Sequence, residues 1–129
     1  MKYKVVESKL KTNKSRSYLW NNMNSPEKII KIEGYKNSRI KQVSDNNYEI
    51  ICDYGVIVLN FIPNRGVNEI FVGKRNCPLT WFEIKGEKDC TITHGEYKRI
   101  DGGMSERNLK REIDWLKNHF LEELREIAK

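Results

Sequence analysis

The chain has 129 residues, with 24 Lys and Arg against 18 Asp and Glu, a net charge of +6 and 33% charged residues. This length predicts one domain over residues 1–129, and the sequence has no apolar run near the roughly 18 residues of a membrane-spanning helix. Glu7 interrupts the apolar stretch that a signal peptide needs, and three scattered cysteines make no disulfide framework. We therefore expect a cytoplasmic protein with reduced thiols.

The first third of the chain predicts a strand and two short helices. Residues 2–11 alternate loosely between apolar and charged side chains, as in a half-buried strand. A helix is expected over residues 15–24, after a run of residues that can cap it. Ser25 and Pro26 start a second helix, and Gly34 can end it in a left-handed conformation.

Between about residues 37 and 100 the pattern changes to short apolar runs separated by turn residues, as at Pro63–Gly66. Six predicted strands follow one another at intervals of roughly ten residues, which is the spacing of an antiparallel meander. They lie around Ile40–Val43 and Tyr48–Tyr54 and over residues 56–62, 67–74, 79–85 and 90–100.

The last segment predicts one long amphipathic helix. Ser105 can cap it, and it runs to about residue 128, a length of roughly 35 Å. Such a helix can cross a whole sheet and bury one of its faces. Its apolar side chains recur at steps of three and four and form one stripe of Leu109, Ile113, Leu116, Phe120, Leu124 and Ile127.

The predicted order of elements is strand, two short helices, six strands and a long helix. Within it, Leu19-Trp20 and the following Ser25-Pro26-Glu27-Lys28 resemble the first helix and the next short motif of the START-like (SRPBCC) helix-grip superfamily, with Ser25 where Asp is common. The resemblance implies an α+β fold. A curved antiparallel sheet of about seven strands would carry two short helices after its first strand and the C-terminal helix on its concave face.

That superfamily includes birch-pollen-allergen, polyketide cyclase/dehydrase and lipid-transfer families, and the resemblance implies an apolar cavity between sheet and helix. Our first hypothesis is a carrier or sensor of a small hydrophobic molecule, such as a lipid, oriented by His94, Tyr48 or Tyr54. The alternative is that the same side chains fill the core solidly. Those expected to line a cavity are Trp20, Ile50, Tyr54, Phe82, Ile84, Ile92, His94, Leu109, Ile113, Leu116 and Phe120.

His94 is the best single candidate for a catalytic residue. It shares a strand face with Ile92, and Glu96 has the same parity, so an imidazole and a carboxylate could exchange protons in one pocket. Our second hypothesis is a cyclase- or dehydratase-like enzyme with His94 as general base. The alternative is a hydrogen-bonded histidine at the end of the sheet. We assign no chemistry to His119, which lies beside Phe120 on the last helix.

We expect no metal site and no cofactor. The sequence has no Cys-x-x-Cys or His-x-x-x-His spacing. Cys90 and His94 lie on one strand face but about 13 Å apart, too far to share one ion. The stretch from Gly66 to Gly73-Lys74 lacks the spacing of a phosphate-binding loop.

Nucleic-acid binding is the third hypothesis. Residues 1–45 contain eleven Lys and Arg against four Asp and Glu, with Tyr3 and Tyr18 among them. Aromatic rings between cations can stack on bases while the cations neutralise phosphates. The same pattern also suits a solvated lysine-rich surface, and the sequence favours no particular oligomeric state.

Overall fold

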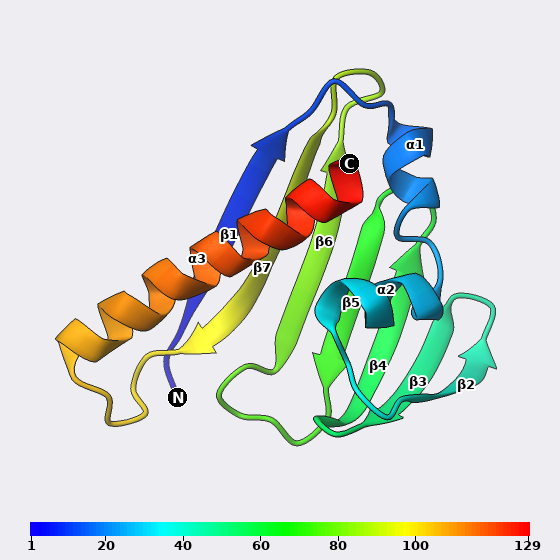
Figure 1. The fold of residues 1–129 in the computed structure, drawn as a ribbon. Coiled ribbons are helices and arrows are strands. Elements are labelled where there is room, and N and C mark those ends of the chain that lie inside the picture. Colours follow the sequence, from blue (N-terminus) through cyan, green and yellow to red (C-terminus); the bar gives the residue numbers. More distant parts are fainter.

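The computed structural model describes residues 1–129 as a single antiparallel sheet with three helices (Figure 1). Strand β1 (Tyr3–Lys11) is followed by helices α1 (Arg16–Asn21) and α2 (Pro26–Glu33), and the chain ends in helix α3 (Glu106–Ala128). The strands between them are β2 (Arg39–Ser44), β3 (Asn47–Cys52), β4 (Gly55–Ile62), β5 (Gly66–Phe71), β6 (Leu79–Lys85) and β7 (Thr91–Arg99).

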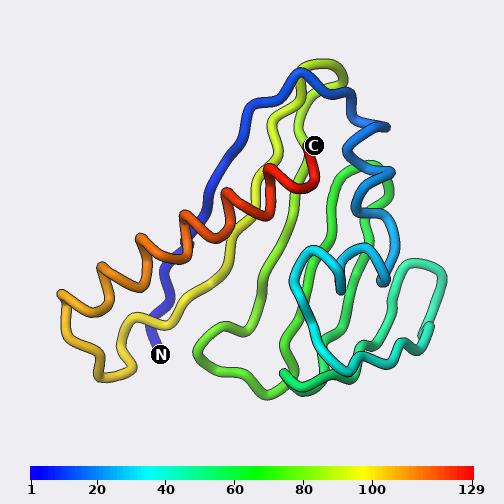
Figure 2. Tube along the Cα trace, in the orientation of Figure 1, coloured from blue at the N-terminus to red at the C-terminus, as the bar shows by residue number.

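The sheet has the order β1-β7-β6-β5-β4-β3-β2, and all its neighbours are antiparallel. Six consecutive strands form a meander, and β1 joins its far end beside β7. The chain path in Figure 2 places α3 across β1 and β7, while α1 and α2 lie on the same side of the sheet over its other half. The α+β helix-grip fold expected from the sequence is confirmed.

Local sequence signals account for the helix ends. The hydroxyls of Ser15, Ser25 and Ser105 accept hydrogen bonds from backbone N–H groups in the first turns of α1, α2 and α3. Gly34 ends α2 with a positive φ of 73°, a conformation that costs glycine little. The observed α1 stops at Asn21, short of the predicted residue 24, because the next turn leads into the cap at Ser25.

The core lies between the concave face of the sheet and the helices. Its larger cluster joins α1, α2 and the C-terminal end of α3 to strands β3–β7, whereas a smaller cluster of Val6, Ile113 and Phe120 joins α3 to β1. Strand β2 is exposed along its whole length, so Ile40 and Val43 lie outside the core. None of the helices is long and apolar enough to cross a membrane.

The register of the sheet aligns the residues of β4 to β7 in two adjacent rows on the concave face, and polar side chains occur in both. In one row Leu59, Glu69, Thr80 and Glu96 lie side by side on β4 to β7. The adjacent row contains Phe61, Val67, Phe82 and His94 on the same strands. Residues two apart on a strand share a face, so this packing aims Glu69, His94 and Glu96 at the helices.

Strands β5 and β6 approach each other closely at Gly66, and a substitution there tests this contact. A Cβ at this position would lie 2.0 Å from the Phe82 carbonyl oxygen, and this backbone contact cannot relax by a side-chain rotation. We expect Gly66→Ala to lower the free energy of unfolding by about 2–4 kcal/mol in urea denaturation. The control is Gly102→Ala, whose Cβ would meet only the Arg99 side chain at 3.9 Å. Equal stability of the two variants would contradict so close an approach of the two strands.

Candidate functional site

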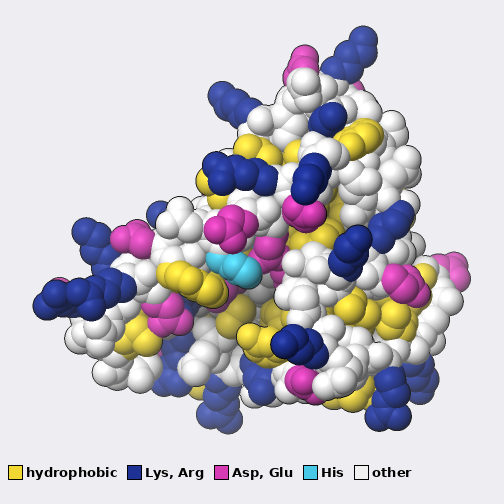
Figure 3. Space-filling view, in the orientation of Figure 1, with side chains coloured by type: hydrophobic (Ala, Val, Ile, Leu, Met, Phe, Trp, Pro, Cys, Tyr) yellow, Lys and Arg dark blue, Asp and Glu magenta, His cyan; other side chains and the backbone are white.

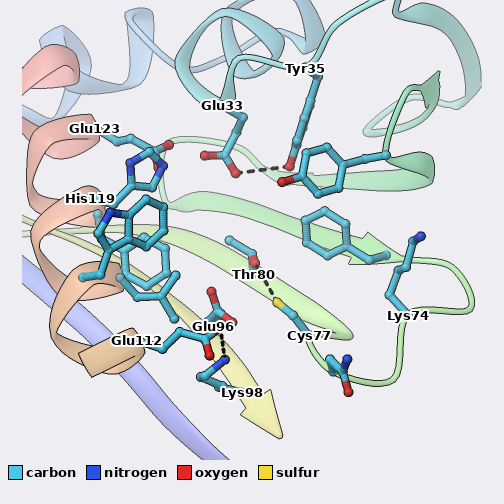
Figure 4. A pocket seen from close by; sticks show the side chains of 16 residues that line it. Glu33, Tyr35, Lys74, Cys77, Thr80, Glu96, Lys98, Glu112, His119 and Glu123 are labelled. Carbon is cyan, nitrogen blue, oxygen red and sulfur yellow. Dashed lines mark hydrogen bonds and ion pairs between the residues drawn. The ribbon is translucent and has the colours of Figure 1, made fainter. Parts of the chain in front are cut away.

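A pocket of about 380 Å³ opens between α3, the end of α2 and strands β5–β7. Figure 4 shows Glu33, His119 and Glu123 at one end, Lys74 at the opposite side, and Lys98 with Glu112 in a third corner. Its lining mixes aromatic and acidic side chains: Glu33, Tyr35, Tyr54, Phe71, Lys74, Asn76, Cys77, Thr80, Glu96, Lys98, Glu112, Trp115, Leu116, His119, Phe120 and Glu123.

The pocket contains only some of the residues that the sequence proposed for a cavity. Tyr54, Leu116 and Phe120 line it. Tyr54 does so from the turn after β3, not from the strand face on which it was placed. The remaining expected residues lie in or against the packed core: Ile50, Phe82, Ile84, Ile92 and Trp20 in the larger cluster, Ile113 and Leu109 in the smaller one, and His94 buried among aromatic rings.

The His94 ring is fixed on all sides behind the pocket. It is 0% exposed, stacks on Phe82 at a centroid distance of 3.7 Å and meets Phe120 at 4.4 Å. Its Nδ1 lies 2.8 Å from the Trp81 carbonyl oxygen. A carbonyl only accepts, so Nδ1 carries a hydrogen and donates it. Nε2 points the other way, 3.5 Å from Glu33 Oε1 and 3.6 Å from Glu123 Oε2.

Glu33 and Glu69 meet on either side of one tyrosine hydroxyl. The last residue of α2 supplies Glu33, and Tyr35 follows directly after the Gly34 cap. The Tyr35 hydroxyl donates to Glu69 Oε1 at 2.6 Å and lies 3.2 Å from Glu33 Oε2. Glu69 is 0% exposed, and its Oε2 has no hydrogen-bond partner. Two carboxyl groups of distant segments are thus held in one buried network.

Helix α3 closes the cluster from the other side. Glu123 is 6% exposed, and its Oε1 lies 2.9 Å from His119 Nε2, one helical turn away. The His119 ring stacks on Trp115 at 5.0 Å, so the three residues form a continuous edge along the helix. In the space-filling view, a histidine lies among acidic and hydrophobic side chains on the face over α3, and Lys and Arg side chains lie around this group as well as along the outline (Figure 3).

Burial and neighbouring charges set the protonation of this cluster. Burial, reinforced by the charge of Glu33, raises the pKa of Glu69 well above its usual value. Burial, with the nearby charge of Glu33, raises the pKa of Glu123 to about 8. Burial opposes charge on His94 and Glu33 too, but the attraction between their opposite charges outweighs it. The pKa of His94 rises to about 10, and the pKa of Glu33 falls.

The result at neutral pH is a nearly neutral buried cluster, with one ion pair between Glu33 and His94 and protonated carboxyl groups around it.

In the third corner of the pocket, Lys98 Nζ lies 2.6 Å from Glu112 Oε1. Burial, together with the charge of Glu96, raises the pKa of the Cys77 thiol to about 12, so this cysteine is not an activated nucleophile.

The sequence singled out His94 but missed its partners. Glu33, His94 and Glu123 come from α2, β7 and α3, and their ligand-type atoms lie within 4.8 Å of one another. The three residues are far apart in the sequence, so no short sequence motif could reveal them together. A weaker signal was available, because Glu69 shares strand parity with Val67 and Phe71, and Glu123 lies between Phe120, Leu124 and Ile127 on the apolar stripe.

Comparison with known proteins identifies the fold. No protein-family model matches the chain, and neither does any curated protein. An uncharacterised protein from Bacillus thuringiensis superposes with a TM-score of 0.61 at 9% identity, covering 97% of this chain and 96% of that one. The Zhui aromatase/cyclase of a Streptomyces species gives 0.59 at 11% identity, covering 98% and 92%. Ara h 8.0201 gives 0.53 at 9% identity, covering 98% of each.

These similarities cover nearly the whole chain and show that it shares the helix-grip fold of these proteins. At such low identities they show the architecture alone. The function must therefore be argued from the pocket and its side chains.

The burial of Glu69 makes stability depend on pH. The unfolded chain releases this proton above about pH 4.5 while the folded chain keeps it, so the group's contribution to stability declines as pH rises. Glu69→Gln removes that dependence and keeps an oxygen for the Tyr35 hydroxyl. Between pH 5 and 7, the difference in unfolding free energy should shift in the variant's favour by up to about 1.4 kcal/mol per pH unit.

Urea denaturation at several pH values, with a chelator present, measures this shift. The control is Glu126→Gln on the exposed side of α3, where a surface substitution changes stability by less than about 0.5 kcal/mol. A constant difference between Glu69→Gln and the parent across this range would show that Glu69 is ionised in the folded chain.

Proposed function

We propose that the protein binds a small, largely hydrophobic molecule in the pocket between the sheet and α3. The observation that supports this most is the form of the pocket itself. Its volume of about 380 Å³ falls in the range of small-molecule sites, and aromatic side chains converge with a few polar groups at one end. Most core side chains pack elsewhere under the sheet, and those that reach the pocket, such as Tyr35 and Phe120, form its walls without filling it.

The lining favours a flat apolar body. Tyr35, Phe71 and Phe120 present rings, and Tyr35 meets Tyr54 and Phe71 edge to face at centroid distances of 6.0 and 6.5 Å. Such rings bind planar apolar surfaces well because they offer both faces and edges. The exposed Trp115 at the mouth can cover the outer end of the molecule.

The inner end would orient the ligand through a polar group. Glu33, Glu123 and His119 offer oxygens and a ring nitrogen there, which suit a hydroxyl or amino substituent. Tyr48, expected to help orient a ligand, instead packs against the core beside Phe61. His94 acts behind the pocket, as the counter-charge of Glu33.

The alternative is an enzyme that uses the same pocket. This hypothesis is motivated by the aromatase/cyclase among the structural neighbours. His94 is a poor general base in this position, because one ring nitrogen donates to Trp81 and the other faces two carboxyl groups. The imidazole that lines the pocket is His119. Native mass spectrometry separates the two functions by the mass of a co-purified molecule before and after incubation with the protein. A carrier leaves this mass unchanged, whereas an enzyme converts the molecule.

The pocket does not favour nucleic-acid binding. The polar groups that converge in it are mainly carboxyl groups, and neither their charged nor their protonated form offers the positive charge that binds phosphates. Arg16, from the basic N-terminal third, is committed to the fold, because it donates to the carbonyls of Asn64 and Gly86 and pairs with Glu87.

The neutral aromatic dye N-phenyl-1-naphthylamine tests the pocket directly. We expect saturable fluorescence enhancement with one site per chain. Leu116→Trp should weaken dye binding at least about 10-fold, because the larger ring occupies the cavity. Val43→Trp, on exposed β2, is the matched control and should bind the dye as the parent does. Undiminished binding to folded Leu116→Trp would refute this pocket as the ligand site.

A further inference from the structure

Three side chains from distant segments place a ring nitrogen or a carboxyl oxygen in one small space at the inner end of the pocket. Glu33 ends α2, His94 lies in the middle of β7, and Glu123 is in the last turns of α3. His94 Nε2 lies 3.5 Å from Glu33 Oε1 and 3.6 Å from Glu123 Oε2, and all three atoms lie within 4.8 Å of one another.

Two of these atoms are buried without any hydrogen-bond partner, namely His94 Nε2 and Glu123 Oε2. Leaving a buried polar atom without a hydrogen bond costs about 1–3 kcal/mol, and a small ion between these two atoms, which lie 3.6 Å apart, would compensate both. The opposite nitrogen of His94 donates to the Trp81 carbonyl at 2.8 Å. Because Nδ1 keeps its hydrogen in this bond, release of the Nε2 proton would leave that lone pair to coordinate an ion, which is the usual arrangement of a metal-binding histidine.

The spacing suits a metal ion better than direct hydrogen bonds. Typical N–H···O bonds measure about 2.7–3.2 Å, which is shorter than both separations from Nε2. In a tetrahedral site with bonds of about 2.0–2.1 Å, neighbouring ligand atoms lie about 3.3–3.4 Å apart. The two separations from Nε2 therefore need only a small contraction for the three residues to coordinate one ion.

Each of the three residues is also supported from outside. His119 Nε2 lies 2.9 Å from the other oxygen of Glu123, the Tyr35 hydroxyl lies 3.2 Å from the other oxygen of Glu33, and Trp81 holds His94. Such outer contacts orient ligands and are a regular part of metal sites. Two carboxylates and a neutral imidazole would moreover balance a divalent cation, which lowers the cost of burying their charge.

We propose that Glu33, His94 and Glu123 form a binding site for a divalent transition-metal ion, with Zn²⁺ the best fit. Nitrogen and oxygen donors without a thiolate suit Zn²⁺ and its first-row neighbours, and the two separations from Nε2 are close to those of a tetrahedral site. Three protein ligands leave one position open. Because Glu33 and Glu123 line the pocket, water or a polar group of a bound molecule would complete the coordination there. This site does not depend on the proposed function.

The other candidate for the same space is a proton on His94 Nε2, and metal titration distinguishes the two. The full chain is stripped with EDTA, freed of chelator and dialysed against Zn²⁺, and bound metal is measured by mass spectrometry. We expect one ion per chain with a dissociation constant of about 1 μM or below. Co²⁺ should show the visible bands of a tetrahedral nitrogen- and oxygen-ligated ion. Absence of saturable binding to the parent chain overturns the proposal, whatever the variants do.

Isosteric variants then locate the ion. Glu33→Gln and Glu123→Gln should each weaken Zn²⁺ binding at least about 100-fold, since each removes a charged ligand. Glu112→Gln, which removes a pocket carboxylate paired with Lys98 outside the cluster, is the control and should bind as the parent does. Circular dichroism and the melting temperature of the metal-free variants show whether they remain folded.

His119→Ala separates this site from a surface site on α3. Loss of an outer contact should weaken binding by about 10–100-fold without abolishing it. If His119→Ala abolishes binding while Glu33→Gln does not, the ion sits on the helix surface and the proposal is wrong. Binding of the naphthylamine dye to the metal-free chain is measured in parallel, so failure of the metal site and failure of the hydrophobic pocket give different results.

Discussion

The arrangement of the site depends on the burial of α3 against the sheet. The apolar stripe of this helix packs into both core clusters, and Glu123 lies between Phe120 and Leu124 on the same side. Burying the stripe therefore carries a carboxyl group into the interior, where an uncompensated charge would cost several kcal/mol. His94 and Glu33 lie where they can compensate it. The packing of α3 therefore fixes where the polar cluster forms.

The register of the sheet positions the other members of the cluster. Strand register sets Glu69, Thr80 and Glu96 side by side in one row and His94 in the next. Since α3 crosses β1 and β7 while α1 and α2 cover the other half, the rows are left partly uncovered between the two groups of helices. The pocket lies at this gap, which explains why its floor is polar while the neighbouring core is apolar.

Sequence patterns were sufficient for the architecture because they are local. Period-two runs, turn residues, the serine caps and the stripe from Leu109 to Ile127 each act within a few residues. The site was only partly accessible to the same reasoning. Glu33, Glu69 and Glu123 look like ordinary surface carboxylates, and their meeting depends on strand register and on where α3 crosses the sheet. Apart from Leu116, the aliphatic residues proposed for the cavity lie in or against the core, because strand parity shows which face a residue occupies but not whether a helix covers it.

The composition of the pocket limits what can occupy it. Although the chain carries a net charge of +6, the pocket is lined by four glutamates against two lysines, and one of those lysines is paired with Glu112. These carboxyl groups offer no positive charge to a fatty acid or another anion, so the metal-free pocket favours neutral or cationic molecules. A divalent ion between Glu33, His94 and Glu123 would offer an open coordination position at the inner end. The same apolar walls would then accept a molecule whose anionic group coordinates the ion, so occupancy of the cluster decides the charge of the ligand.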